Sequence, residues 1–127
     1  MRGVLVDTSV WVDHFRRRNA AMVELLASES ALTHPMVLAE LACGTPPAPR
    51  LRTLRDLRLL RQTQQASLPE VMDLIEREEL YGLGCGLIDL MLLASTLISP
   101  VAELWTLDKR LAALADRFGV LHQPTMQ

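Results

Sequence analysis

Short apolar runs with the character of buried strands alternate along this chain with longer segments of helical periodicity. The strand-like runs cover residues 4–6, 30–33, 64–67, 103–106 and 119–121. Strands that alternate with helices pair in parallel, because each helix carries the chain back across the sheet. The pattern therefore predicts an α/β fold: a three-layer α/β/α domain with a central, mostly parallel sheet of about five short strands.

The helical segments are predicted at residues 9–15, 20–28, 36–43, 50–62, 69–80, 87–98 and 108–117. A proline-rich linker at residues 45–49 separates the third helix from the fourth, because proline breaks helices. In the fourth helix, leucines and arginines recur at helical spacing, which indicates an amphipathic helix. Its arginine stripe consists of Arg52, Arg55, Arg58 and Arg61.

The length and composition fit one domain, residues 1–127, of which half is apolar. The apolar run near the N-terminus is too short for a signal peptide, and no run approaches the length of a membrane span. We therefore expect a cytoplasmic protein. Cys43 and Cys85 have no spacing typical of a metal site, and we expect both to be buried free thiols.

The net charge is −2, so the whole molecule is not a polycation. The cations are 12 arginines and a single lysine, Lys109. Arginine presents a planar fork that suits phosphate as well as carboxylate groups. The arginine bias is compatible with an RNA partner and equally compatible with a genome rich in G and C.

Three carboxylates occupy apolar surroundings. Asp7 ends the run VLV, Glu40 lies within MVLAELAC, and Asp89 lies within GLIDLMLLA. A buried charge costs several kcal/mol unless it is paired or binds a metal. Arginine and lysine are absent between Asn19 and Pro49 and again between Glu78 and Leu107. A bound divalent cation would stabilise these carboxylates, and oxygen-only ligands favour Mg²⁺ or Mn²⁺.

Asp108 is a fourth candidate, because it follows a strand as Asp7 does, and parallel strands end at one shared edge. Each acid also has a simpler interpretation. Asp7 and Asp108 suit helix caps, Glu40 suits the solvated edge of a helix, and Asp89 suits a first helical turn. Each simpler interpretation is stronger for a single residue. Four coincidences are needed to explain all four residues, and we therefore favour a common site.

Four segments together resemble the acidic blocks of PIN-domain ribonucleases, and most of all the VapC toxins of bacterial toxin–antitoxin pairs. The segments are VLVDTSVWVDHF, HPMVLAELACG, GLIDLMLLAS and LWTLDKRLAALADRFGV, in this order along the chain. The resemblance implies a parallel sheet flanked by helices. It also implies endonucleolytic cleavage of RNA by water that Mg²⁺ or Mn²⁺ activates.

The resemblance also assigns roles to residues. Asp7, Glu40, Asp89 and Asp108 match the acidic quartet, with Asp7 and Asp89 as direct metal ligands and the other two orienting water. Ser9 and Thr106 match hydroxyl positions beside the acids. Many relatives carry a further acid shortly after the last block's threonine, whereas Lys109 and Arg110 follow Asp108 here. The number of metal ions, one or two, therefore stays open.

A VapC-like toxin implies a cognate VapB-like antitoxin, a homodimer, and an RNA substrate such as transfer or ribosomal RNA. The helices at residues 36–43 and 50–62 are candidates for the dimer or antitoxin surface. Arg16, Arg17 and Arg18 are candidate RNA contacts, and the arginine stripe is either a further contact or only a solvated face. The alternatives are a nuclease outside a toxin–antitoxin pair or acting on DNA, a catalytically silent nucleic-acid-binding module, and an aspartyl-phosphate phosphatase.

Overall fold

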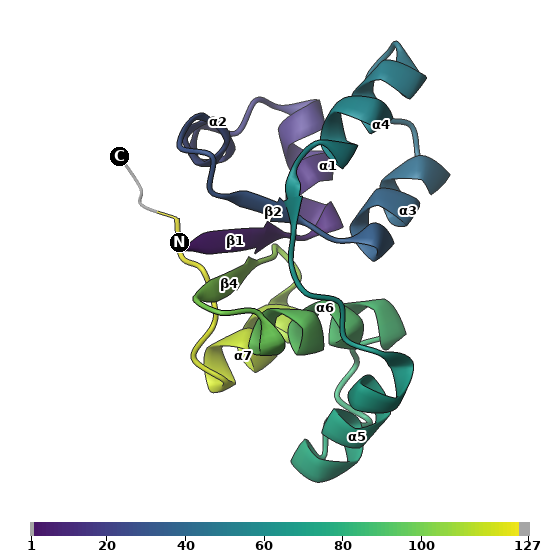
Figure 1. Ribbon diagram of the computed structural model, residues 1–127, viewed down its shortest axis with the longest axis vertical. Helices are drawn as coiled ribbons and strands as arrows, with labels where there is room; N and C mark the ends of the chain where they lie inside the picture. Colours follow the sequence, from purple (N-terminus) through teal and green to yellow (C-terminus); the bar gives the residue numbers. More distant parts are fainter. Residues whose placement is uncertain (1, 125–127) are drawn as a thin grey trace.

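A computed structural model describes residues 2–124, which form four strands and seven helices (Figure 1). The strands are β1 (Gly3–Val6), β2 (Ala31–Thr33), β3 (Arg61–Gln62) and β4 (Ala102–Trp105). The helices are α1 (Thr8–Arg16), α2 (Ala20–Ala27), α3 (Pro35–Cys43), α4 (Arg50–Arg58), α5 (Leu68–Glu78), α6 (Leu87–Ile98) and α7 (Lys109–Arg117).

The strands form one parallel sheet in the order β3-β2-β1-β4. β1 lies in the middle, and all four of its residues are buried, as expected for a parallel strand covered on both faces. The predicted parallel α/β fold is confirmed, with four strands among residues 2–124. Residues 119–121 contribute only an isolated bridge between Leu121 and Leu104 in place of the predicted strand.

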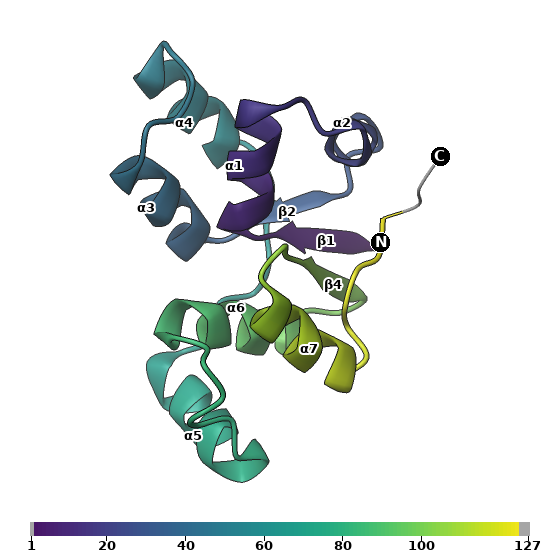
Figure 2. The ribbon, with the colours of Figure 1, turned by 180° about the vertical axis from the view of Figure 1, so that it is seen from behind.

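The helices lie in two groups on either side of the strands. In Figure 1, α1 to α4 lie above the strands and α5 to α7 lie below them, and Figure 2 shows the same division from behind. The core between them includes fully buried Leu5, Leu92, Leu93 and Leu104. Burial of each such side chain stabilises the fold by about 1.5–3 kcal/mol. This packing fixes the edge of the sheet at which the strands end.

The helix predicted over residues 50–62 ends earlier than expected. α4 stops at Arg58, and residues 61 and 62 turn into the edge strand β3, which pairs with Leu32 and Thr33 of β2. The prediction for residues 61–62 was wrong because the local leucine spacing carries no information about this tertiary pairing. Leu51 at the start of α4 is 78% exposed, so the leucine stripe is not wholly buried.

The strand predicted at residues 64–67 is absent from the described part of the chain. The backbone N–H of Gln64 donates to Ser99 Oγ, and that of Ala66 donates to Ser95 Oγ. These serine hydroxyls therefore accept the backbone hydrogen bonds that a neighbouring strand would otherwise accept. This segment crosses from β3 to α5 without joining the sheet.

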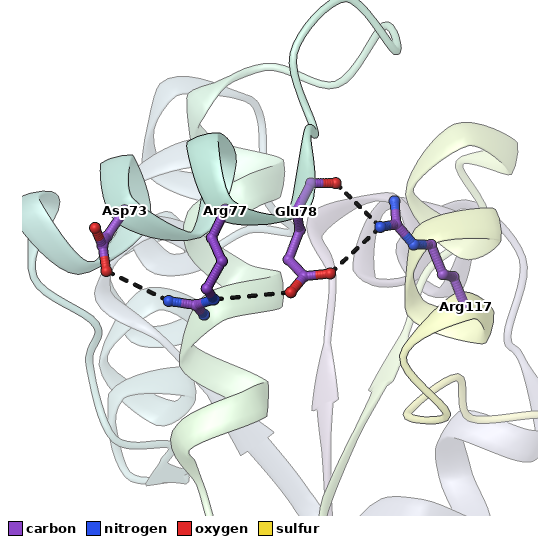
Figure 3. Close-up of polar contacts among 4 residues, drawn as sticks. All are labelled: Asp73, Arg77, Glu78 and Arg117. Atoms are coloured by element: carbon purple, nitrogen blue, oxygen red, sulfur yellow. Dashed lines mark hydrogen bonds and ion pairs between the residues drawn. The ribbon is translucent and has the colours of Figure 1, made fainter.

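Helix α5 is held at both ends. At its start, Ser67 and Glu70 form a capping box, in which each side chain accepts from the other residue's backbone N–H. At its end, Arg117 of α7 donates to both the carbonyl and the carboxylate of Glu78 (Figure 3). Arg77 joins Glu78 to Asp73 in the same network. These contacts tie α5 to α7, beside α6.

Helix α6 is the most apolar helix, and six of its residues are buried. Its bounds match the prediction. No helix within residues 2–124 is long and apolar enough to cross a membrane. Both cysteines are free, but Cys43 is exposed and Cys85 is half-buried, so the expectation of two buried thiols was wrong. Cys43 is the last residue of α3 and faces solvent, whereas Leu41 in the same turn is buried.

Candidate active site

Asp7 lies where β1 ends and α1 begins, and the residue is only 6% exposed. It occupies the N-cap position of α1, yet its carboxylate makes no cap hydrogen bond to the helix. An N-cap carboxylate ordinarily accepts from the backbone two or three residues ahead. The simple interpretation of Asp7 as a helix cap therefore does not account for its side chain.

Two hydroxyl groups bind the Asp7 carboxylate instead. Ser9 and Thr106 each donate to Asp7 Oδ2 at 2.7 Å. These hydroxyls accept in turn from the turn after β4: Leu107 N–H donates to Ser9 Oγ, and Asp108 N–H donates to Thr106 Oγ1, both at 3.0 Å. Each hydroxyl thus accepts from a backbone N–H and donates to the carboxylate, and together they orient it. The other oxygen, Oδ1, accepts no hydrogen bond from residues 2–124.

Asp89 lies in the first turn of α6 and accepts from the backbone N–H of Gly86 at 3.2 Å. Burial raises the pKa of Asp89, the Gly86 hydrogen bond lowers it, and the nearby carboxylates of Asp7 and Asp108 raise it further. The net shift is upward. Three carboxylates from three separate elements therefore interact electrostatically at one edge of the sheet.

Asp108 caps helix α7, as its simpler interpretation predicted. Its Oδ1 accepts from the backbone N–H groups of Arg110 and Leu111, both at 2.9 Å. The residue is exposed, in contrast to Asp7. The cap fixes one carboxylate oxygen and leaves Oδ2 free of hydrogen bonds within residues 2–124.

Glu40 of α3 reaches the site through Thr8. The Thr8 hydroxyl donates to Glu40 Oε1 at 2.7 Å, and Thr8 directly follows Asp7. Glu40 and Thr8 also line a cavity of about 410 Å³, together with Arg16, Val12, Phe15, Leu41 and residues 44–47. Thr8 was not among the predicted site residues. Its position between Asp7 and Ser9, both predicted site residues, could have indicated that Thr8 also belongs to the site.

The residues fit a hard divalent cation, although they do not form a compact ready-made cluster. Within residues 2–124, no group of three His, Cys, Asp or Glu side chains is arranged closely enough to hold a metal ion. None of the ion pairs in that part of the chain includes Asp7, Glu40, Asp89 or Asp108. Carboxylate and hydroxyl oxygens without a cationic partner are the donors that Mg²⁺ and Mn²⁺ prefer.

The candidate RNA-binding arginines lie at different distances from this site. Arg16, Arg17 and Arg18 at the end of α1 are exposed, and Arg16 lines the same cavity as Glu40. Arg17 pairs weakly with Asp13 at 3.7 Å. The stripe Arg52, Arg55 and Arg58 is exposed on α4, whereas Arg61 lies in β3 and does not continue it.

The amino-acid sequence matches the PIN-domain family over residues 4–117, a stretch that contains all four candidate acids. It is also 43% identical over 117 residues to Ribonuclease VapC32 of Mycobacterium tuberculosis, in strains CDC 1551 / Oshkosh and ATCC 25618 / H37Rv. The alignment covers 92% of this chain and 94% of that relative. The chain belongs to the VapC-type PIN-domain ribonucleases.

This membership confirms the resemblance found in the four acidic segments, and it agrees with the parallel α/β architecture. PIN-domain ribonucleases typically depend on a metal ion. The oxygen donors around Asp7 agree with that dependence.

Proposed function

We propose that this protein is a Mg²⁺-dependent endoribonuclease, with Mn²⁺ as an alternative ion, and the toxin of a VapBC-type pair. One observation carries the proposal: Asp7 is buried and oriented by two hydroxyls, and Asp7 and Asp108 both lie within electrostatic reach of Asp89. Such an arrangement destabilises the apoprotein by charge repulsion. A site for a divalent cation explains why it is present.

Asp7 and Asp89 are the proposed metal ligands, and Glu40 and Asp108 are proposed to orient water. When bound, the ion would activate water and offset charge on the phosphodiester. Oδ1 of Asp7 would be available to the ion, because Ser9 and Thr106 occupy Oδ2. Oε2 of Glu40 would be available to orient water, because Thr8 occupies Oε1. Hydrolysis of this kind leaves a 5′-phosphate and a 3′-hydroxyl and does not need the RNA 2′-hydroxyl.

Arg16, Arg17 and Arg18 are proposed to bind RNA phosphates beside the cavity that Glu40 lines. An acidic centre repels RNA, so nearby cations must supply the nonspecific affinity. The substrate is proposed to be transfer or ribosomal RNA in the cytoplasm. Residues 1–127 are proposed to act as a single nuclease domain.

The proposed partners are a cognate VapB-like antitoxin and a second copy of the chain. Helices α3 and α4 are candidate surfaces for them, because Met36 of α3, Leu51 of α4 and Leu59 directly after α4 expose apolar side chains. Exposed apolar groups of this size favour contact with another protein surface. The similarity to Ribonuclease VapC32 supports the toxin assignment.

Cleavage of single-stranded RNA by purified protein with Mg²⁺ tests the proposal. We expect the wild type to cut RNA internally and to leave 5′-phosphate ends, and the Asp7→Asn variant to lose at least about 100-fold in rate. Asp116→Asn is the matched control, since Asp116 is an exposed aspartate of α7. Undiminished cleavage by Asp7→Asn would sink the site assignment, and cleavage of DNA alone would contradict the RNA substrate.

Sequencing of RNA ends after induced expression tests the toxin role. New 5′ ends at defined positions in transfer or ribosomal RNA, together with growth arrest, are the expected result. Unchanged end profiles and normal growth would contradict a toxin acting on either RNA.

A further inference from the structure

Arg110 of α7 lies across the glycine-rich segment that precedes α6. Its guanidinium donates to the carbonyl of Gly84 at 3.5 Å, and its side chain packs directly over the Gly84 backbone. Asp108, two residues earlier, starts α7, and Asp89, five residues after Gly84, lies in the first turn of α6. Arg110 thus connects the start of α7, which Asp108 caps, with the segment that leads to Asp89.

Gly84 is required for this placement. A Cβ atom at position 84 would lie 2.6 Å from Arg110 Cδ and 2.8 Å from one of its terminal nitrogens, both far inside contact distance. The residue also has a φ of +89°, which side chains other than glycine rarely adopt. Gly82 has a similar φ of +72°, but its Cβ would meet nothing within 4 Å. Close approach of Arg110 is therefore particular to Gly84.

The charge of Arg110 is not neutralised by the protein. The residue is exposed, and no ion pair among residues 2–124 includes it. It is nevertheless close to the acidic centre: burial raises the pKa of the half-buried Cys85 thiol, Asp89 and Asp108 raise it further, and Arg110 lowers it. A cation in the first turn of a helix is also unfavourable for the helix dipole. Stability of the fold therefore does not explain this arginine.

We infer that Arg110 binds a phosphate of the RNA backbone at the rim of the acidic site. Its planar fork suits the oxygens of a phosphodiester. Within residues 2–124 the guanidinium makes one hydrogen bond, the 3.5 Å bond to the Gly84 carbonyl, which leaves most of its donors free. Packing on Gly84 limits its motion, so less entropy is lost when phosphate binds. The inference rests on the proposed ribonuclease function and adds a substrate contact outside the acidic quartet.

Binding of RNA without cleavage tests Arg110 separately from catalysis. A fluorescein-labelled single-stranded RNA of mixed sequence is titrated with protein in EDTA, and fluorescence anisotropy gives the Kd. Arg110→Ala should weaken binding by about tenfold, the loss expected for one charge-assisted contact. The slope of log Kd against log salt should fall by about 0.7, one phosphate contact on a single strand.

Lys109→Ala is the matched control, since it removes a neighbouring exposed charge that makes no contact with Gly84. It should leave Kd within about twofold, because such a charge is screened by salt. Arg110→Lys keeps the charge but not the fork, and it should recover only part of the affinity. Thermal unfolding of each variant shows that the compared proteins are folded.

A double-mutant cycle tests the role of Gly84 in placing Arg110. Gly84→Ala should weaken RNA binding in the wild-type background and have no further effect in Arg110→Ala, since the displaced side chain is then already absent. Gly82→Ala is the control for backbone strain, because it shares the positive φ without the close contact. It should leave RNA affinity unchanged.

Equal affinity of Arg110→Ala and Lys109→Ala, with an unchanged salt slope, would overturn the inference. Absence of any salt-dependent RNA binding by the wild type would overturn it as well. Failure of the proposed function is distinguishable, since the protein would then bind RNA in EDTA through Arg110 but cleave none when Mg²⁺ is added.

Discussion

The hydroxyl of Thr106 donates a 2.7 Å hydrogen bond to Asp7 Oδ2, across 99 residues of sequence. It joins the ends of β1 and β4, which are neighbouring parallel strands of the sheet, and both residues are buried. Asp108 N–H donates to the same hydroxyl, so the turn that leads into α7 holds the carboxylate of β1 in place. Orientation of Asp7 thus depends on the strand pairing itself.

Thr106→Val should impair cleavage more than stability. The substitution keeps the shape of the side chain but removes one of two donors to Asp7, and loss of a group that orients a metal ligand typically costs about 10–100-fold in activity or metal affinity. We expect a fall of that size in kcat/KM and in Mn²⁺ affinity, measured on the purified protein.

Thr96→Val is the control for this prediction. Thr96 is also buried, and its hydroxyl donates to the carbonyl of Leu92 within α6. It should change the melting temperature at most modestly and leave kcat/KM unchanged. Equal activities of the two valine variants would show that the Thr106 hydroxyl does not orient Asp7 for catalysis.

Asp89→Asn should raise the melting temperature of the metal-free protein at pH 7. Burial, with Asp7 and Asp108 nearby, raises the pKa of Asp89, so the ionised form is disfavoured in the folded state. A group with a raised folded pKa destabilises the fold as pH rises through the ordinary carboxyl range near 3.9 toward the raised value. Asparagine removes the charge and still accepts from Gly86 N–H.

Scanning calorimetry at pH 3 and pH 7, in EDTA, measures this effect. The gain should appear at pH 7 and vanish at pH 3, where the carboxyl is protonated in both states. Asp73→Asn, an exposed control on α5, should show no gain. A melting temperature that falls at pH 7 in Asp89→Asn would mean that charge repulsion at the site does not destabilise the apoprotein.

His34 should make the protein less stable as pH falls below neutrality. Its Nδ1 accepts from Met36 N–H at 3.0 Å, so the ring is neutral and its Nε2 donates to Ser95 Oγ. Burial lowers the pKa of His34. A lowered histidine pKa contributes stability that is present above the unfolded value of about 6.5 and is lost as pH falls from there toward the folded pKa.

Thermal unfolding at pH 7 and pH 5 tests this expectation with His34→Asn, which retains a side-chain acceptor for Met36 N–H at the N-cap. The variant should be less stable at pH 7, because Ser95 loses a partner. Its melting temperature should then fall less than that of the wild type between pH 7 and pH 5. An equal fall of the melting temperature in both proteins would mean that groups other than His34 cause the loss of stability at low pH.

Much of the architecture could be predicted from local sequence. The buried run before Asp7 predicted β1, the helix predicted at residues 36–43 is α3 to within one residue, and the apolar run at residues 87–98 predicted α6 with its bounds. The carboxylates in apolar surroundings pointed to a site, because an isolated buried charge needs a partner. Asp7 is the clearest case, since it is buried and its hydrogen-bond partners are hydroxyls and not cations.

Features that depend on contacts distant in sequence could not be predicted. The end of α4 is set by pairing of Arg61 and Gln62 with β2, and the segment after it is satisfied by hydroxyls of α6. The Thr8 hydroxyl on Glu40 likewise joins two helices. Periodicity reports which face of an element is apolar, but not which neighbour occupies it.

Calorimetric titration with Mn²⁺ tests most directly whether Asp7 is the centre of a metal-dependent site. We expect the wild type and Asp116→Asn to bind Mn²⁺ with the same affinity, and Asp7→Asn to bind it at least about tenfold more weakly while remaining folded. Equal Mn²⁺ affinity in Asp7→Asn and the wild type, or no binding by the wild type, would contradict this assignment.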